Sequence, residues 1–92
     1  MEFEYNHQKS EANKIKHGIG FEDAKKLWES AYVEIEAKTV GEPRFMLIGR
    51  LGSQFYSCIF AKREKKIRII SCRRSREKEV EIYHEFIKET RE

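Results

Sequence analysis

The sequence has few of the features that mark membrane-spanning or secreted proteins. It contains two cysteines and one proline among 92 residues, and it has no long apolar run. A transmembrane helix needs about 20 predominantly apolar residues, so we expect none. Two cysteines cannot form the dense disulfide framework of a small secreted domain, and the first residues lack the basic and apolar segments of a secretory signal. The sequence therefore favours a protein of the reducing cytoplasm.

Apolar residues are also scarce, at 39% of the chain, whereas 38% of the residues are charged. Six phenylalanines, four tyrosines and one tryptophan compensate, because each aromatic side chain can bury a large area. A chain of 92 residues is long enough for one hydrophobic core and too short for two. Because no repeat or linker is visible and the only proline is Pro43, we expect one folded domain over residues 1–92.

Positive charge is concentrated in one segment of the sequence. The formal net charge is only +3, but the segment from Lys62 to Lys78 holds nine lysines and arginines against two glutamates. Such a local excess favours a polyanionic ligand, and arginine can bind a phosphate through two parallel hydrogen bonds. Charge alone leaves two interpretations open: a surface for nucleic acid or an acidic protein, or a solvated turn followed by a charged helix start.

Capping residues predict helices near both ends of the chain. Asn6 can cap a helix over residues 7–16, and Gly18 can follow its end. The apolar stripe expected for this helix is Ala12 and Ile15. A second helix is expected over residues 21–30, after Gly20, with its buried face formed by Phe21, Ala24, Leu27 and Trp28. Ser75 can cap the final helix, whose expected apolar stripe is Val80, Tyr83, Phe86 and Ile87.

Between these helices, alternation of apolar and polar residues predicts strands. The expected strands are residues 3–5, 32–39, 44–51, 54–61 and 66–72. The connections at Gly52-Ser53 and at residues 63–65 are short enough for antiparallel hairpins. The strands at 44–51 and 54–61 are apolar at odd and even positions alike, which is typical of central strands covered on both faces. We expect the helices on one face and a site or a partner on the other.

The predicted fold class is therefore α+β, with an antiparallel sheet of four to five strands, two N-terminal helices and one C-terminal helix. Within the last strand, Arg68 and Arg73 have opposite parity. They are expected on opposite faces of the sheet unless a β-bulge intervenes. An alternative for Arg68 is a purely structural ion pair with Glu34 or Glu36 on another strand.

No metal or cofactor motif is visible, and we expect no cofactor. The three histidines are far apart, and Cys58 and Cys72, which lack the spacing of metal ligands, are expected to pack in the core. Some chemistry needs neither metal nor cofactor, because RNA carries its own nucleophile, the 2′-hydroxyl. Its cleavage requires alignment, proton transfer, and cations that stabilise the charge developing on the phosphate. Lys16 and His17 at a predicted helix end suit this chemistry, although the helix dipole alone also favours them there.

Several segments resemble the BrnT toxins of bacterial type II toxin–antitoxin systems. The resemblance runs from Phe3 to Tyr83, which is nearly the whole chain. The matching segments, with the family pattern in parentheses, include Phe3-Glu4-Tyr5-Asn6 (F-E-W-D), Lys16-His17-Gly18 (K-H-G), Phe21-Glu22-Asp23-Ala24 (F-E-x-A), Glu42-Pro43-Arg44-Phe45 (E-E-R-F), Arg68-Ile69-Ile70-Ser71-Cys72-Arg73-Arg74 (R-I-I-S-A-R-K), and Glu79 with Tyr83 (E…Y). Arg63 matches the family's arginine before the last hairpin turn. The R-I-I-S-A-R-K block and the K-H-G segment together are fairly specific for this family.

The resemblance implies a RelE-like, microbial-ribonuclease-type fold and a metal-independent endoribonuclease that inhibits translation. It also implies a BrnA-type ribbon-helix-helix antitoxin, which would bind operator DNA and hold the toxin in a two-plus-two complex. The predicted site residues are Lys16, His17, Glu42, Arg44, Arg63, Arg68 and Arg73. His17 is the candidate proton carrier, the arginines would bind phosphate or stabilise the transition state, and Glu42 is a further candidate base. The alternative is a small basic module that binds RNA or protein without cleaving it.

Overall fold

The computed structural model describes the backbone of residues 1–91 and the side chains of residues 1–88. Its elements are, in order, β1 (Glu2–Glu4), α1 (His7–His17), α2 (Phe21–Ala24), the 3-10 helix η1 (Lys25–Glu29), β2 (Tyr32–Ala37), β3 (Arg44–Leu51), β4 (Gln54–Arg63), β5 (Lys66–Arg74) and α3 (Glu77–Arg91). This order confirms the predicted α+β class, and each strand ends within two residues of its expected bounds. No helix among residues 1–91 is long and apolar enough to cross a membrane.

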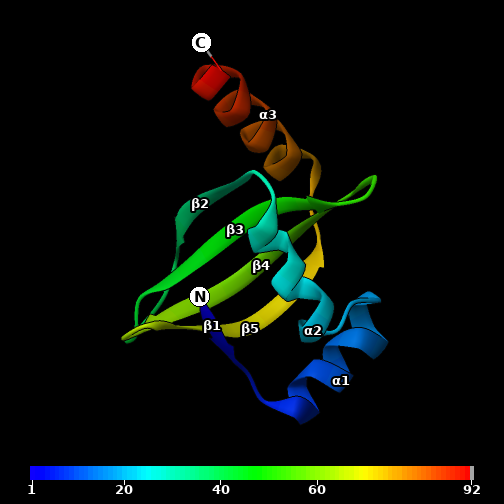
Figure 1. Ribbon diagram of the computed structural model, residues 1–92, viewed down its shortest axis with the longest axis vertical. Helices are drawn as coiled ribbons and strands as arrows, with labels where there is room; N and C mark the ends of the chain where they lie inside the picture. The colour runs from blue at the N-terminus through cyan, green and yellow to red at the C-terminus, as the bar shows by residue number, and fades with distance from the viewer. Residues whose placement is uncertain (92) are drawn as a thin grey trace.

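The strands form one sheet in the order β1-β5-β4-β3-β2 (Figure 1). Strands β2 to β5 follow one another as an antiparallel meander, and β1 joins the free edge of β5 in parallel. Strands β3 and β4 are interior, as their apolar character at both parities predicts.

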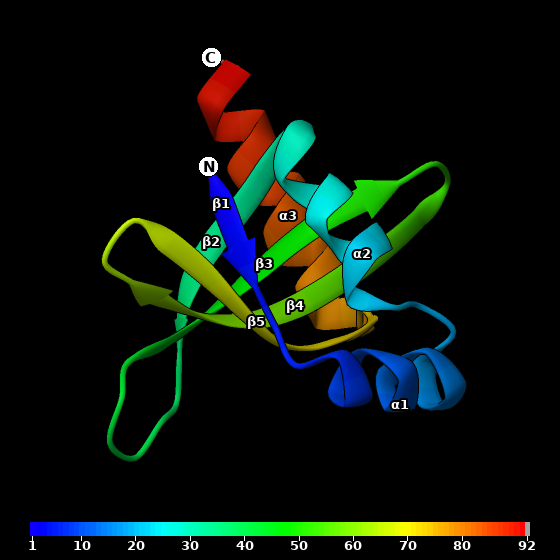
Figure 2. The ribbon, with the colours of Figure 1, turned by 60° about the horizontal axis from the view of Figure 1, so that its bottom comes forward.

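Helices cover both faces of the sheet, so the expectation of helices on one face only was wrong. We call the side covered by α1, α2 and η1 the α2 face; its core includes Leu27, Leu47, Phe60 and Cys72. The opposite side, the α3 face, packs Val33, Ile48 and Tyr83 together. Figure 2 shows α2 in front of the sheet and α3 behind it. The second covering helix is needed because β2 and β3 place apolar side chains on this face as well.

Helix α1 buries an amide instead of the expected apolar stripe. Ala12 is exposed and Ile15 is 86% exposed, whereas Asn13 is buried. The Asn13 Nδ2 donates to the carbonyls of Ile19 and Cys72 (2.7 and 2.8 Å), and its Oδ1 accepts from the Cys72 N–H (3.2 Å). Strand β1 pairs with only the first three residues of β5, so Cys72 lies on an otherwise open sheet edge. Asn13 takes the place of the missing neighbour strand there.

The helix ends agree only partly with the predicted caps. The side chain of Asn6 accepts from the Lys9 N–H (3.0 Å), and Gly18 has φ 79°, both as expected. The predicted buried face of the second helix is confirmed, although the segment becomes a 3-10 helix at Lys25. Ser75 does not cap α3, because its hydroxyl bonds to Ser57 instead.

Only part of the predicted stripe of α3 is buried. Tyr83 is buried, Val80 and Ile87 are half-buried, and Phe86 is 44% exposed. Figure 1 shows the reason: the C-terminal part of α3 extends past the sheet, so side chains there have less to pack against.

Candidate functional site

A β-bulge in β5 determines which charged residues share a face. Ile59 on β4 is opposite Ser71, but the next residue, Phe60, is opposite Ile69. Ile70 therefore has no partner on β4 and is the extra residue of the bulge. The alternation of side chains along β5 is shifted by one residue at this point.

The shift brings two of the predicted site arginines onto the same face. Arg68 is opposite Ala61 and Arg73 is opposite Ser57. Ala61 and Ser57 are four residues apart on one regular strand, so they point the same way, and their partners point with them. The exception allowed for in the sequence prediction, an intervening bulge, is what the structure contains.

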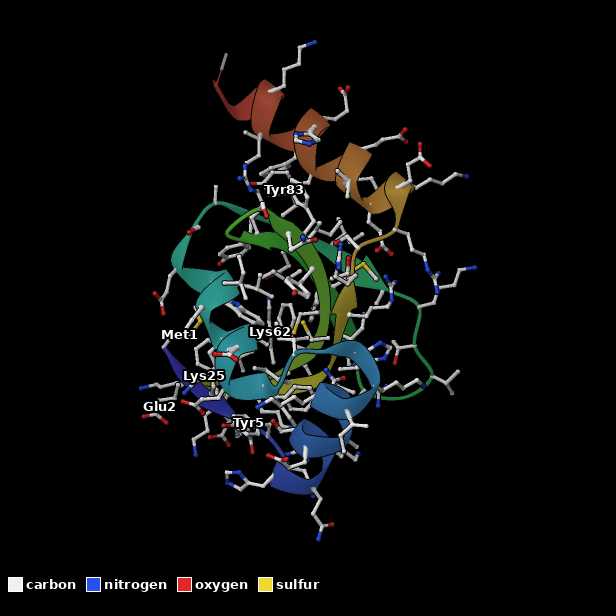
Figure 3. All side chains as sticks on the ribbon, turned by 90° about the vertical axis from the view of Figure 1, so that its right-hand side faces the viewer. Met1, Glu2, Tyr5, Lys25, Lys62 and Tyr83 are labelled. Carbon is white, nitrogen blue, oxygen red and sulfur yellow. The ribbon has the colours of Figure 1, made fainter. Side chains whose placement is uncertain are left out.

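Two further predicted residues lie on this face by the same argument. Arg63 is two residues beyond Ala61 on β4 and so has the same orientation. Arg44 precedes Phe45, which is opposite Phe60, and therefore lies beside Ala61 on the other side from Arg68. The α3 face thus carries Arg44, Arg63, Arg68 and Arg73. Figure 3 shows Tyr83 beneath α3, and Glu2 on β1 well away from that helix.

The part of the α3 face next to the β4–β5 turn is rich in charge. We call this part the hairpin end and define it by Glu4, Glu42, Arg44, Arg63 and Arg68. Ala61, fully buried, forms its floor between Arg44 and Arg68. A hollow of about 720 Å³ adjoins it, lined by Glu2, Glu4, Arg63, Glu64, Lys65 and Lys66.

Two arginines of the hairpin end are held by carboxylates. Arg63 donates to both oxygens of Glu42 (2.9 and 3.1 Å), and this contact raises the pKa of the Arg63 guanidinium. Arg68 donates to Glu4 (3.4 Å), its neighbour on the parallel strand β1. The ion pair expected for Arg68 as the structural alternative is therefore present, but the predicted partners were wrong. Its partner is Glu4, and Glu34 binds Lys62 instead (2.7 Å).

Arg44 differs from these two arginines. Among the residues that the structure describes, no ion pair or hydrogen bond of its side chain is found. It lines a second hollow, of about 620 Å³, with Lys38, Thr39 and Val40 from the β2–β3 loop. Its guanidinium is therefore directly available to an anionic ligand.

Arg73 has a different setting, at the start of α3. It donates to both oxygens of Glu79 (2.8 and 2.7 Å), which also accept from the Ser57 hydroxyl (2.7 Å) and the Arg76 N–H (2.9 Å). These contacts, that of Arg73 above all, lower the pKa of Glu79 to about 2. The Glu79 side chain is only 13% exposed, so this network anchors α3 to the sheet.

Lys16 and His17 lie away from the hairpin end, because α1 packs beside Cys72 and not beside the β4–β5 turn. They form the C-terminal end of α1, which packs against β5 and α2. Figure 2 shows α1 beside the end of β5 that is farthest from the β4–β5 turn. The predicted residues therefore fall into two groups, with Glu42 and the four arginines on the α3 face and the Lys16-His17 pair in the α1 layer.

The two cysteines pack in the core, as expected. Cys58 and Cys72 are opposite each other on β4 and β5, fully buried and not joined in a disulfide. A hydrogen bond with Cys72 and burial raise the pKa of the Cys58 thiol well above its usual range. A thiol of this kind is a poor nucleophile at neutral pH.

The family model for the ribonuclease toxin BrnT of type II toxin–antitoxin systems matches residues 5–79. The chain belongs to the BrnT family. The resemblance found in the sequence is thereby confirmed, and with it a ribonuclease toxin that has RNA as its target and an antitoxin as its partner. No curated protein matches the chain.

The BrnT match covers every predicted site residue and ends at Glu79, in the first turn of α3. Two residues important for this face were missed by sequence reasoning: Glu4, the partner of Arg68, and Glu79, the partner of Arg73. Glu79 could have been found, because a glutamate at the third position of a helix commonly binds back to the N–H that precedes the helix. Glu4 gave no such signal, because its role depends on the parallel pairing of β1 with β5.

Proposed function

We propose that this BrnT-family chain is a metal-independent endoribonuclease that cuts RNA at the hairpin end of its α3 face and so inhibits translation. The observation that supports this most is the grouping of Arg44, Arg63 and Arg68 around the small side chain of Ala61. Guanidinium groups bind phosphate oxygens in a bidentate manner, and the side chains of these three arginines are accessible to a phosphodiester at the surface.

The reaction we propose is attack of a 2′-hydroxyl on the adjacent phosphorus. The P–O bond to the 5′-oxygen of the next nucleotide breaks, leaving a 2′,3′-cyclic phosphate on one fragment; the departing oxygen takes a proton from water and becomes the 5′-hydroxyl of the other. Arg44, Arg63 and Arg68 would stabilise the additional negative charge on the phosphate oxygens. Glu42, whose carboxylate lies at the same end of the face, would accept the proton of the 2′-hydroxyl.

The structure also leads us to assign different roles to the other predicted residues. Arg73 is committed to Glu79 and acts by holding α3 in place. Lys16 and His17 lie in the other layer, so we propose that they bind RNA outside the cleavage centre rather than carry the proton.

We further propose that the antitoxin is of the BrnA type, a ribbon-helix-helix protein of the cytoplasm that binds operator DNA and forms a two-plus-two complex with the toxin. Its acidic side chains would cover the hairpin end in place of RNA phosphates. Light scattering on the complex purified after co-expression with the adjacent antitoxin gene should give the mass of two copies of each chain. A mass corresponding to one copy of each would contradict this stoichiometry.

The test of the activity is incubation of the purified chain with labelled RNA in EDTA. We expect fragments ending in a cyclic phosphate, and a loss of about tenfold or more in cleavage rate for Arg63→Ala and Arg68→Ala. Arg74→Ala is the matched control, because Arg74 is opposite Tyr56 and so faces the α2 side. Intact RNA that still binds to the chain would instead indicate a binding module without catalytic activity.

A further inference from the structure

The two arginines that the proposed function relies on most are occupied by the protein's own carboxylates. Glu42 accepts two hydrogen bonds from Arg63, and Glu4 accepts one from Arg68. Neither glutamate belongs to the β4–β5 hairpin: Glu4 comes from β1, and Glu42 from the loop between β2 and β3. A carboxylate and a phosphate bind the same kind of donor, so a phosphate competes with Glu42 for Nε and Nη2 of Arg63 and with Glu4 for Nη1 of Arg68.

These ion pairs are accessible, unlike the one that anchors α3. The exposed fractions of the side chains are 48% for Arg63, 39% for Glu42, 32% for Arg68 and 34% for Glu4. The corresponding values are 26% for Arg73 and 13% for Glu79, which has additional partners. Exposed ion pairs contribute little to stability because water and salt screen them. The main effect of the two ion pairs at the hairpin end is therefore on the binding of anionic ligands to Arg63 and Arg68.

Both carboxylates are positioned by the backbone. Glu4 is fixed by the pairing of β1 with β5, which places it directly beside Arg68. The loop that carries Glu42 is held by a hydrogen bond from the Thr39 hydroxyl to the Glu42 carbonyl (2.7 Å). Arg63 and Arg68 are themselves offset by two residues along adjacent strands, which corresponds to about 8 Å between their Cα atoms. Successive phosphates of one extended RNA strand can reach both.

We propose that Glu4 and Glu42 are specificity-determining residues that compete with RNA phosphates for Arg68 and Arg63. A ligand must replace both carboxylates to bind fully, so the hairpin end selects a strand with successive phosphates over a single phosphate group. This inference rests on the proposed function, because it concerns the same face and the same ligand class. It adds that the face is partly blocked in the free protein.

The test is the binding of a 2′-O-methyl RNA oligonucleotide, which cannot be cleaved, measured by fluorescence anisotropy. Glu4→Gln and Glu42→Gln are each expected to lower Kd about threefold to tenfold, because the arginine is released without losing a hydrogen-bonding neighbour. Any removal of negative charge tightens RNA binding somewhat. Glu36→Gln is therefore the control: it changes the charge equally, but Glu36 is opposite Phe45 and faces the α2 side.

The outcomes separate this inference from the proposed function. Values of Kd for Glu4→Gln and Glu42→Gln equal to that of the control, or higher than that of the parent, would overturn the competition. If Arg63→Ala and Arg68→Ala leave Kd unchanged, RNA does not bind at the hairpin end and the proposed function itself fails. If the arginine variants weaken binding and the glutamine variants do not tighten it, only the competition fails. The selection for a strand would be contradicted if a mononucleotide bound with the same free energy per phosphate as the oligonucleotide.

Discussion

Replacing Glu79 by glutamine should loosen α3 from the sheet. The substitution keeps the size of the side chain and removes the charge that binds Arg73, Ser57 and the Arg76 N–H. One pKa unit corresponds to about 1.4 kcal/mol, so lowering the pKa from 4.5 to about 2 corresponds to at most about 3.4 kcal/mol of stability at neutral pH. Because glutamine keeps part of the hydrogen bonding, we expect a loss of about 2 kcal/mol, or about 8–16 °C in Tm for a domain of this size.

The pH dependence gives an independent check of the same reasoning. The pKa of Glu79 is lower in the folded than in the unfolded state, so its stabilisation is complete above the ordinary value of 4.5 and is lost as the pH falls towards about 2. Urea unfolding of the parent and of Glu79→Gln at several pH values should therefore show a difference in unfolding free energy that is largest near neutrality and shrinks through this window.

Glu81→Gln is the matched control for this prediction, because Glu81 is an exposed glutamate of the same helix. It should change the unfolding free energy by less than about 0.5 kcal/mol. The reasoning would be refuted if Glu79→Gln behaved like this control, or if its effect stayed constant between pH 5 and pH 2.

Other predictions concern single contacts. Asn13→Ala should lower the unfolding free energy in urea by about 2–4 kcal/mol, because the N–H and C=O of Cys72 lose their partner inside the protein; a loss below 1 kcal/mol would contradict this. Gly18→Ala should lower it by about 1 kcal/mol through backbone strain at φ 79°, since an added Cβ meets nothing within 4 Å. Arg68→Ala should reduce the slope of log Kd for RNA against log salt by about 0.7, and an unchanged slope would rule out a phosphate contact there.

Much of the architecture follows from patterns that are local in the sequence. The cap at Asn6, the left-handed residue at Gly18 and the apolar spacing after Gly20 each depend on only a few neighbouring residues, and each was predicted correctly. The double-sided apolar pattern of β3 and β4 also identified them as interior strands.

The features that failed depend on partners distant in the chain. Asn13 is buried because Cys72, 59 residues later, leaves its backbone open at the edge of β5. Ile15 had the spacing of a buried residue, but its side chain is 86% exposed. The candidate site was predicted by residue type and by resemblance, whereas its division into two groups is a property of the assembled layers. No local pattern could show that α1 would pack beside Cys72, away from the β4–β5 turn next to Arg63.

Ile70, the extra residue of the bulge, also determines the face of the sheet on which the side chains of residues 66–69 lie. An uninterrupted β5 that kept Ile70 in the ladder would rotate residues 66–69 by half a turn relative to residues 71–74, because side chains alternate with a period of two. In such a strand Arg68 would point into the apolar layer that contains Trp28, while Ile67 and Ile69 would leave this core for the other face. Deletion of Ile70 alone would therefore remove the bulge and leave Arg68 and Arg73 on one face, whereas deletion of Ile69 and Ile70 together would turn Arg68 to the opposite face.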